Sequence, residues 1–129
     1  MAQIVFYGEK QHLRGVRDRL SEIVHGVARR VLGLPEDKRF HRFIGLEAED
    51  FVHPPDRSGA YTIIEISLFE GRSAEAKTAL LKGLMAEISA GLSIPVEDVE
   101  ITLFETPRAN WGIRGQTGDE LALNYKVKV

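Results

Sequence analysis

Gly33-Leu34-Pro35-Glu36-Asp37 and Ser93-Ile94-Pro95-Val96-Glu97-Asp98 are two versions of one pattern in this chain. Each stretch comes after a long amphipathic helix pattern. A short apolar strand pattern lies before each helix and another lies after each stretch. Glycine suits the left-handed position just past a helix end, and a proline soon afterwards prevents the helix from resuming. The chain is therefore predicted to form strand-helix-strand, and then a second strand-helix-strand.

The first repeat covers about residues 1–47. Its first strand is Ile4–Tyr7, a β-rich run that ends at Gly8. The next element is a helix with apolar residues at steps of three and four, as expected for one buried stripe. A second strand is predicted over residues 39–46. The apolar stripe of the helix consists of Leu13, Val16, Leu20, Ile23, Val24, Val27 and Val31.

The second repeat covers about residues 61–106 and comes after a predicted loop at residues 48–60, which holds two prolines and a Ser-Gly pair. Its first strand is residues 61–69. Ser73 can cap the next helix by accepting a hydrogen bond from a free backbone N–H, and Gly91 is expected to end that helix. The buried faces are predicted to consist of Ile64, Ile66 and Leu68 in the first strand, Ala76, Leu80, Leu84 and Ile88 in the helix, and Val99, Ile101 and Leu103 in the last strand.

Two such units with right-handed crossovers predict an α+β fold, in which a four-stranded mixed sheet carries both helices on one face. The other face also holds apolar residues, including Ile63, Phe69 and Phe104, and the chain offers no further helix to cover it. Self-association through this face is the simplest expectation. Residues 107–129 form a predicted oligomerisation tail, and the alternation over residues 125–129 suggests an edge strand with solvated lysines.

The composition is that of one soluble domain of 129 residues, of which 43% are hydrophobic and 28% are charged. A net charge of −2 gives no attraction to nucleic acid or to an anionic membrane. No apolar run is long enough to span a membrane, and the start lacks a signal peptide's basic region, so we expect a cytoplasmic protein. No cysteine is present, and no dinucleotide or phosphate-loop motif occurs. The four histidines lack metal-site spacing, so neither a metal nor a cofactor is predicted.

The second half contains the most specific motifs. Residues 68–73 read Leu-Phe-Glu-Gly-Arg-Ser; after them come a helix, Pro95, an apolar strand at residues 99–105 and Trp111-Gly112-Ile113. This series resembles a subunit of the tautomerase superfamily of the 4-oxalocrotonate type. The whole chain, with its two fused units, is similar to the malonate semialdehyde decarboxylase group. The resemblance implies a homotrimer built around a barrel-like core of three sheets.

The same resemblance implies a catalytic amine at the start of the chain. The family uses an amino-terminal proline, which removal of the initiator methionine exposes. Here that position is Ala2, whose small side chain should still permit the removal of Met1. A free primary amine has an ordinary pKa of about 7.7–8.0, and burial or nearby cations would lower it. Such an amine can accept a proton or form an imine with a carbonyl group. By resemblance, Ala2 is the candidate catalytic residue.

Four further positions are implied as substrate-binding. Arg72 falls on an arginine that binds substrate carboxylate in the family, a task that suits the forked guanidinium. Trp111 falls on an aromatic residue that lines the family's pocket. Lys38 takes the place of an aspartate of the decarboxylase group, and His41 lies in the same cationic run. Glu70 replaces a second arginine, and this reversal of charge should repel an anionic substrate.

These residues predict a cofactor-independent, tautomerase-like isomerase or lyase that acts on a small 2-oxo or enol carboxylate. The missing proline, aspartate and second arginine argue against malonate semialdehyde decarboxylase activity. One alternative is a non-catalytic trimeric binding or structural protein on the same scaffold. Another is new chemistry carried out by Lys38, His41 or Glu70 in the same pocket. The role of Arg57, which lies in the loop between the repeats, stays open.

Overall fold

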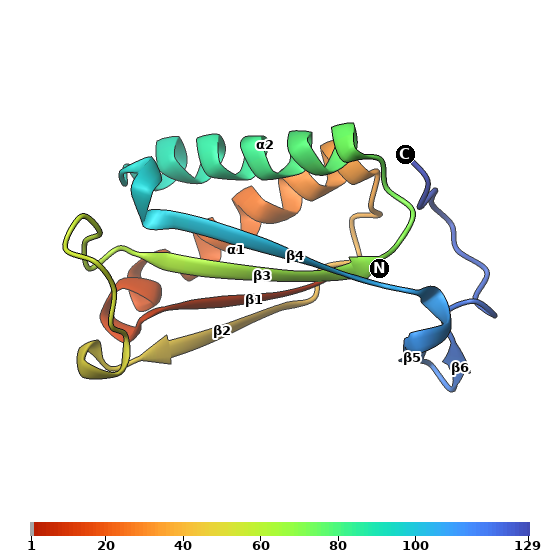
Figure 1. Ribbon diagram of the computed structural model, residues 1–129, viewed down its shortest axis with the longest axis horizontal. Coiled ribbons are helices and arrows are strands. Elements are labelled where there is room, and N and C mark those ends of the chain that lie inside the picture. Colours follow the sequence, from red (N-terminus) through yellow and green to blue (C-terminus); the bar gives the residue numbers. More distant parts are fainter. Residues whose placement is uncertain (1) are drawn as a thin grey trace.

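The computed structural model describes residues 2–129, and its elements alternate as two β-α-β units (Figure 1). The first unit consists of β1 (Ala2–Glu9), α1 (Lys10–Leu32) and β2 (His41–Leu46). The second unit consists of β3 (Thr62–Phe69), α2 (Ala74–Leu92) and β4 (Val99–Thr106). The short elements are η1 (Ala48–Asp50), η2 (Val96–Asp98), η3 (Arg108–Asn110), β5 (Gly112–Ile113) and β6 (Gln116–Thr117).

The main sheet has the strand order β2-β1-β3-β4. Within each unit the two strands are parallel, and the central pair, β1 and β3, is antiparallel. Both helices lie on one face of this sheet (Figure 1). The predicted α+β fold, with a four-stranded mixed sheet and two helices on one face, is confirmed.

The two units match each other at a constant spacing of sixty residues. In the first unit Ile4 pairs with His41, and in the second Ile64, sixty positions later, pairs with Ile101, sixty positions after His41. The same spacing separates the ends of α1 and α2, and the turns η1 and η3. Because β1 and β3 run in opposite directions, a residue near one end of the sheet and the equivalent residue sixty positions away lie at opposite ends of the sheet.

The helix ends use the expected turn chemistry, with one difference. Gly33 has a left-handed conformation (φ 68°) after α1, as predicted. Ser73 caps α2 by accepting a hydrogen bond from the N–H of Ala76 at 3.1 Å. Gly91, however, does not end α2: the helix continues to Leu92, and Ser93 takes the left-handed conformation instead. Gly91 has a packing role, since a Cβ there would lie 2.5 Å from Cδ1 of Ile23 in α1.

The core lies between the helices and the sheet. Alternate residues of β1 and β3 point into it, as the period of two for a strand requires. This confirms the predicted buried face of residues 64, 66 and 68. The most completely buried large side chains are Phe6, Leu20, Val24, Leu32, Ile64, Ile66, Leu68, Phe69, Leu80, Leu84 and Ile88.

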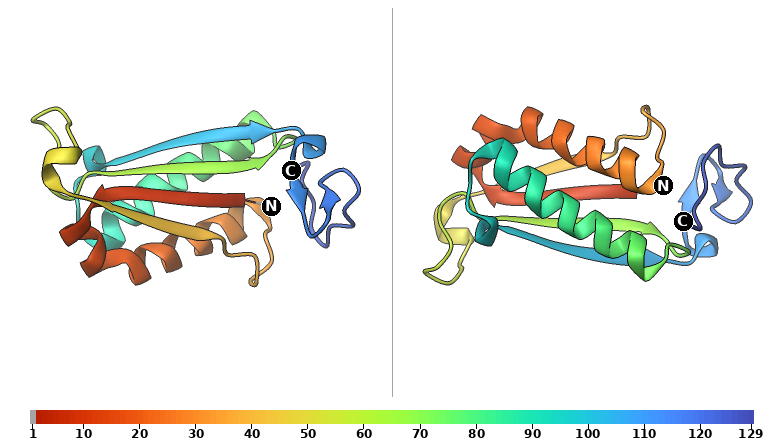
Figure 2. Two further views of the ribbon diagram at one scale, coloured as in Figure 1. Left: turned by 90° about the horizontal axis from the view of Figure 1, so that it is seen from below. Right: turned by 90° about the horizontal axis from the view of Figure 1, so that it is seen from above.

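No helix covers the opposite face of the sheet in the described residues 2–129 (Figure 2, left). Phe40, just before the edge strand β2, is 40% exposed, Ile44 on β2 is 42% exposed, and Phe104 on β4 is 48% exposed. This open sheet face agrees with the absence of a covering helix expected from the sequence. Neither helix of the described chain combines the length and apolar character that crossing a membrane requires.

The carboxyl-terminal tail crosses the end of the sheet at which β1 begins (Figures 1 and 2). Residues 125–129 do not form the predicted edge strand within the chain. Their alternation serves packing instead: Val127 is buried against Phe69, while both lysines stay exposed. The tail lies beside Gly71, where a Cβ would be 3.1 Å from Val127 Cγ1, and the carbonyl of Val129 accepts a hydrogen bond from the N–H of Ser73 at 3.1 Å.

His41 belongs to the packing of α1 against the sheet. Its Nδ1 shares a hydrogen bond with Oγ of Ser21 at 2.7 Å, and its ring meets the edge of Phe6. Burial lowers the pKa of His41 to about 4, with smaller contributions from the nearby His25 and Arg39. The folded protein therefore holds this ring neutral at pH 7.

We expect His41 to make the fold sensitive to acid. The unfolded chain takes up this proton near pH 6.5, well above the folded pKa of about 4, so stability falls as the pH drops through that window. Urea unfolding at pH 7 and pH 5 should show a loss of up to about 2 kcal/mol from this group. A His41→Gln variant should lack that part of the loss, whereas His53→Gln in the loop should keep it. Equal pH dependence in all three proteins would contradict the assignment.

Candidate functional site

Three segments meet at the end of the sheet where β1 begins. Ala2, the first described residue, pairs with Leu68 near the end of β3. The chain then passes through Phe69 to the turn before α2, and the tail lies against this turn (Figure 2). The side chain of Ala2 is 5% exposed and packs in the main core, so the strand end is firmly placed. Met1 lies outside the described residues.

Arg72 is the most unusual side chain at this end. It is 5% exposed, and its Nη1 donates a hydrogen bond to the carbonyl of Phe69 at 3.1 Å. Its Nε and Nη2 are buried and have no hydrogen-bond partner within residues 2–129. Burial lowers the pKa of Arg72, and Glu105 acts in the opposite direction. A buried, charged donor without a partner is costly, and an unpaired Nε–Nη2 edge has the forked geometry that a carboxylate matches.

Aromatic rings stand beside this turn. Phe69 is fully buried, and Trp111 contacts it edge to face with 5.0 Å between the ring centroids. The guanidinium of Arg108 also lies against Phe69, 5.5 Å from its ring centroid. Trp111 therefore packs at the same end of the molecule as Arg72.

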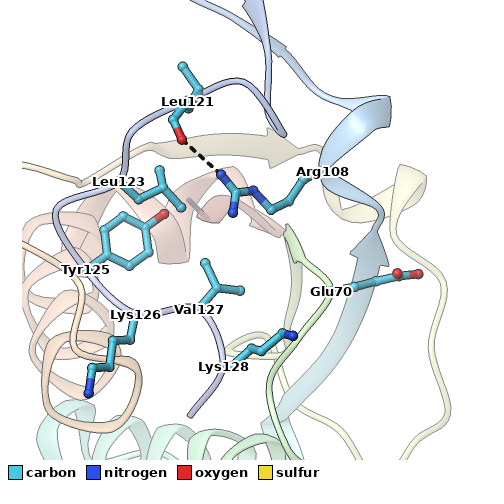
Figure 3. A pocket seen from close by; sticks show the side chains of 8 residues that line it. All are labelled: Glu70, Arg108, Leu121, Leu123, Tyr125, Lys126, Val127 and Lys128. Atoms are coloured by element: carbon cyan, nitrogen blue, oxygen red, sulfur yellow. Dashed lines mark hydrogen bonds between the residues drawn. The ribbon is translucent and has the colours of Figure 1, made fainter.

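A cavity of about 440 Å³ opens between the tail and this end of the sheet (Figure 3). Three of its lining residues are cationic and one is acidic. The carboxylate of Glu70 points away from the other labelled side chains (Figure 3). The cavity is lined by Glu70, Arg108, Leu121, Leu123, Tyr125, Lys126, Val127 and Lys128.

Two lining residues were not predicted from the sequence. Arg108 Nε donates to the carbonyl of Gly118 at 2.9 Å, and Nη2 donates to that of Leu121 at 3.1 Å. The hydroxyl of Tyr125 is buried and has no partner among the described residues. Proximity to the tryptophan motif was the only sequence signal for Arg108. Tyr125 enters the site through the path of the tail, which no local pattern encodes.

None of the predicted site residues lines this cavity. Lys38 is in the loop between α1 and β2, with Nζ 4.0 Å from Asp37 Oδ2. His41 turns toward α1 and lines a different cavity of about 350 Å³ beside the edge strand β2. The structure thus places Ala2, Arg72 and Trp111 at one end of the sheet, and places His41 in the helix–sheet layer.

The opposite end of the sheet carries a separate polar network. Arg57 pairs with Asp56 and Glu100 and lies over the Tyr61 ring. Asp98 is buried and accepts hydrogen bonds from the backbone and hydroxyl of Ser58, which anchor the loop between the units. Across the described part of the chain, His, Asp and Glu side chains form no group of three that could hold a metal ion.

Comparison with known proteins shows that the chain is similar to tautomerases. A family model described as "Tautomerase enzyme" matches residues 38–114. A probable tautomerase of Ralstonia nicotianae is 42% identical over 53 residues, which are 41% of this chain and 76% of that protein. A probable tautomerase of Bacillus subtilis is 27% identical over 110 residues, covering 78% and 87%. The 2-hydroxymuconate tautomerase of Pseudomonas putida is 32% identical over 59 residues, covering 46% and 94%.

Solved structures share the fold. Native fused 4-OT superimposes with a TM-score of 0.80 at 22% identity, covering 92% of this chain and 98% of the other. A malonate semialdehyde decarboxylase superimposes with a TM-score of 0.78 at 21% identity, covering 88% and 92%. The predicted resemblance is confirmed. Since the family model spans more than half of its residues, this chain belongs to the tautomerase family.

Proposed function

We propose that this protein is a cofactor-independent tautomerase-like enzyme that interconverts the enol and 2-oxo forms of a small carboxylate at the Ala2 end of the sheet. The observation that carries the proposal is the buried guanidinium of Arg72, which has two nitrogens without a partner in the described chain. Family membership supports the reaction class, since several relatives are tautomerases by name.

Each residue has a defined role in this proposal. Arg72 binds the carboxylate through its open nitrogens, and Trp111 forms an aromatic wall beside it. With Met1 removed, the amine of Ala2 accepts the proton of the enol hydroxyl, and a proton is returned to the neighbouring carbon. Nothing is oxidised or reduced. A base with a pKa near the working pH contributes about 10²–10⁴-fold in such a step.

The amine mechanism requires the removal of Met1. Mass spectrometry of the purified protein should show a chain that begins at Ala2. Borohydride treatment with a 2-oxo acid should then add the mass of the reduced imine to that residue, because a primary amine can form an imine. An Ala2→Pro variant should raise enol-ketonisation activity if the rest of the site is intact. A chain that retains Met1 would rule out this amine as the catalyst.

We expect enol-ketonisation activity to depend on Arg72, because this residue binds the substrate carboxylate in the proposed function. Arg72→Ala should lower kcat/KM for enol ketonisation by about 10²-fold, because two charge-assisted hydrogen bonds are lost. Arg72→Lys should recover only part of the loss, since an ammonium group lacks the forked geometry. Arg29→Ala, which changes an exposed arginine of α1, is the matched control. Activity unchanged in Arg72→Ala, with the protein folded, would place the substrate elsewhere.

A second candidate function is a binding protein without turnover. The absence of the family's proline favours it, because Ala2 offers only a primary amine. In that case carboxylate binding depends on Arg72 while no ketonisation occurs at any pH. Turnover that is lost when the amino terminus is blocked would exclude this alternative.

We also propose that the protein is a homotrimer, that the open sheet face is its interface, and that residues 107–129 contribute to assembly. Exposed Phe40, Ile44 and Phe104 support this, and related fused 4-OT structures are described as trimers. Sedimentation should give three times the chain mass of 14.4 kDa. Ile44→Glu should dissociate the assembly, while Val52→Glu in an exposed loop should not. A parent protein that sediments as a stable monomer would contradict the proposal.

A further inference from the structure

The unpaired edge of Arg72 is closed off from solvent. Its Nε and Nη2 are buried, and the residue is 5% exposed. Arg72 is not among the residues that line the cavity of about 440 Å³ at this end of the sheet. A carboxylate that enters this cavity therefore does not touch the two nitrogens, and part of the chain has to move before it can bind them.

The tail lies across the turn that holds Arg72. On one side of this residue, a Cβ at Gly71 would be 3.1 Å from Cγ1 of Val127. On the other side, the N–H of Ser73 donates a hydrogen bond to the carbonyl of Val129 at 3.1 Å. Figure 2 shows the tail beside this end of the sheet. Both sequence neighbours of Arg72 therefore contact the tail, which makes the tail the segment that closes the site.

The last part of the tail, residues 121–129, is attached at few points. It contains neither helix nor strand. Residues 122–128 form no hydrogen bond with any other part of the described chain. Val127 is the one buried residue among them, and it packs on Phe69. A segment with so few hydrogen bonds and buried contacts opens at a low cost in free energy.

Charge favours the closing of this segment over an anion. Lys126 and Lys128 are exposed and form no ion pair within residues 2–129, and residues 121–129 include no acidic side chain. Arg72 is also cationic, and the nearby Glu105 is already paired with a lysine of α2 at 2.8 Å. Without a ligand these like charges repel one another. A carboxylate bound to the guanidinium neutralises it and removes this repulsion.

We infer that residues 121–129 form a strap over Arg72, that the strap opens by releasing Val127 and Val129 to admit a carboxylate, and that it closes again over the bound ligand. The admission of a substrate rests on the proposed function, whereas the covering of Arg72 does not. The carbonyl of Leu121, held by Arg108, is the fixed end of the strap. Because only open molecules can bind, the rate of association is proportional to the open fraction.

Hydrogen exchange followed by NMR tests the strap without any ligand. The amide of Ser73 reports opening directly, because its hydrogen bond runs to Val129. Val127→Ala removes packing that holds the strap closed and so raises the open fraction. It should therefore speed the exchange of both the Ser73 amide and the Arg72 Nε–H by about tenfold.

Two controls separate opening of the strap from general loosening. The amide of Ala76 donates to Oγ of Ser73 at the same helix start, and it should keep its exchange rate in Val127→Ala. Val52→Ala makes the same substitution at a residue that is 91% exposed, and it should change no rate. An Arg72 Nε–H that exchanges at the parent rate in Val127→Ala would overturn the inference, because another part of the chain would then cover the guanidinium.

A reversible lock tests whether ligands pass the strap, and it does not depend on how well Val127→Ala folds. The chain has no cysteine, so Ser73→Cys combined with Val129→Cys adds a single disulfide between two residues that a backbone hydrogen bond already joins. The oxidised protein should bind 2-oxobutanoate at least about tenfold more slowly than the same protein after reduction. Equal association rates would contradict the strap. Faster exchange in Val127→Ala, with no binding of 2-oxobutanoate by any form, would instead count against the proposed function alone.

Discussion

A buried guanidinium without enough hydrogen-bond acceptors is the constraint on which one end of this protein depends. Arg72 has to lie inside the fold because the turn after β3 starts at buried Phe69 and the tail closes over Gly71. The described chain satisfies only Nη1 and leaves Nε and Nη2 open. Such an arrangement costs stability unless something else binds there. In the proposed function a carboxylate ligand satisfies both nitrogens at once.

The repeated scaffold explains why the proposed function is confined to one end. The two units share their register, their helix ends and their turns at a spacing of sixty residues. They differ in the segment that comes after the last strand of each. After β2 the chain continues into the loop that Asp98 anchors, whereas after β4 it becomes the tail that places Arg108 and Tyr125. Only the first unit, moreover, can present an amine, because the nitrogen of Thr62 is part of a peptide bond.

Local sequence patterns predicted most of the fold, since helix periodicity, strand alternation and the glycine–proline stops each depend on near neighbours. They did not predict features that depend on contacts between distant parts of the chain. Gly91 does not end α2; its missing side chain instead leaves room for Ile23 of α1. Residues 125–129 alternate like a strand, but within the chain Val127 packs on Phe69 and pairs with no strand. Family motifs indicated Arg72 and Trp111, which lie at the same end of the sheet as the cavity. Arg108 and Tyr125, which line the cavity, reach it through the course of the tail, which no short pattern specifies.

Carboxylate binding by the open nitrogens of Arg72 can be observed at the side chain itself. The measurement is the nitrogen-15 NMR signal of the Arg72 side chain, assigned with an Arg72→Lys variant, during titration with 2-oxobutanoate. We predict that the Nε–H signal shifts with saturation and exchanges more slowly with water, because a charge-assisted hydrogen bond forms there. A titration in which 2-oxobutanoate binds while the Arg72 signal stays unchanged would contradict this role.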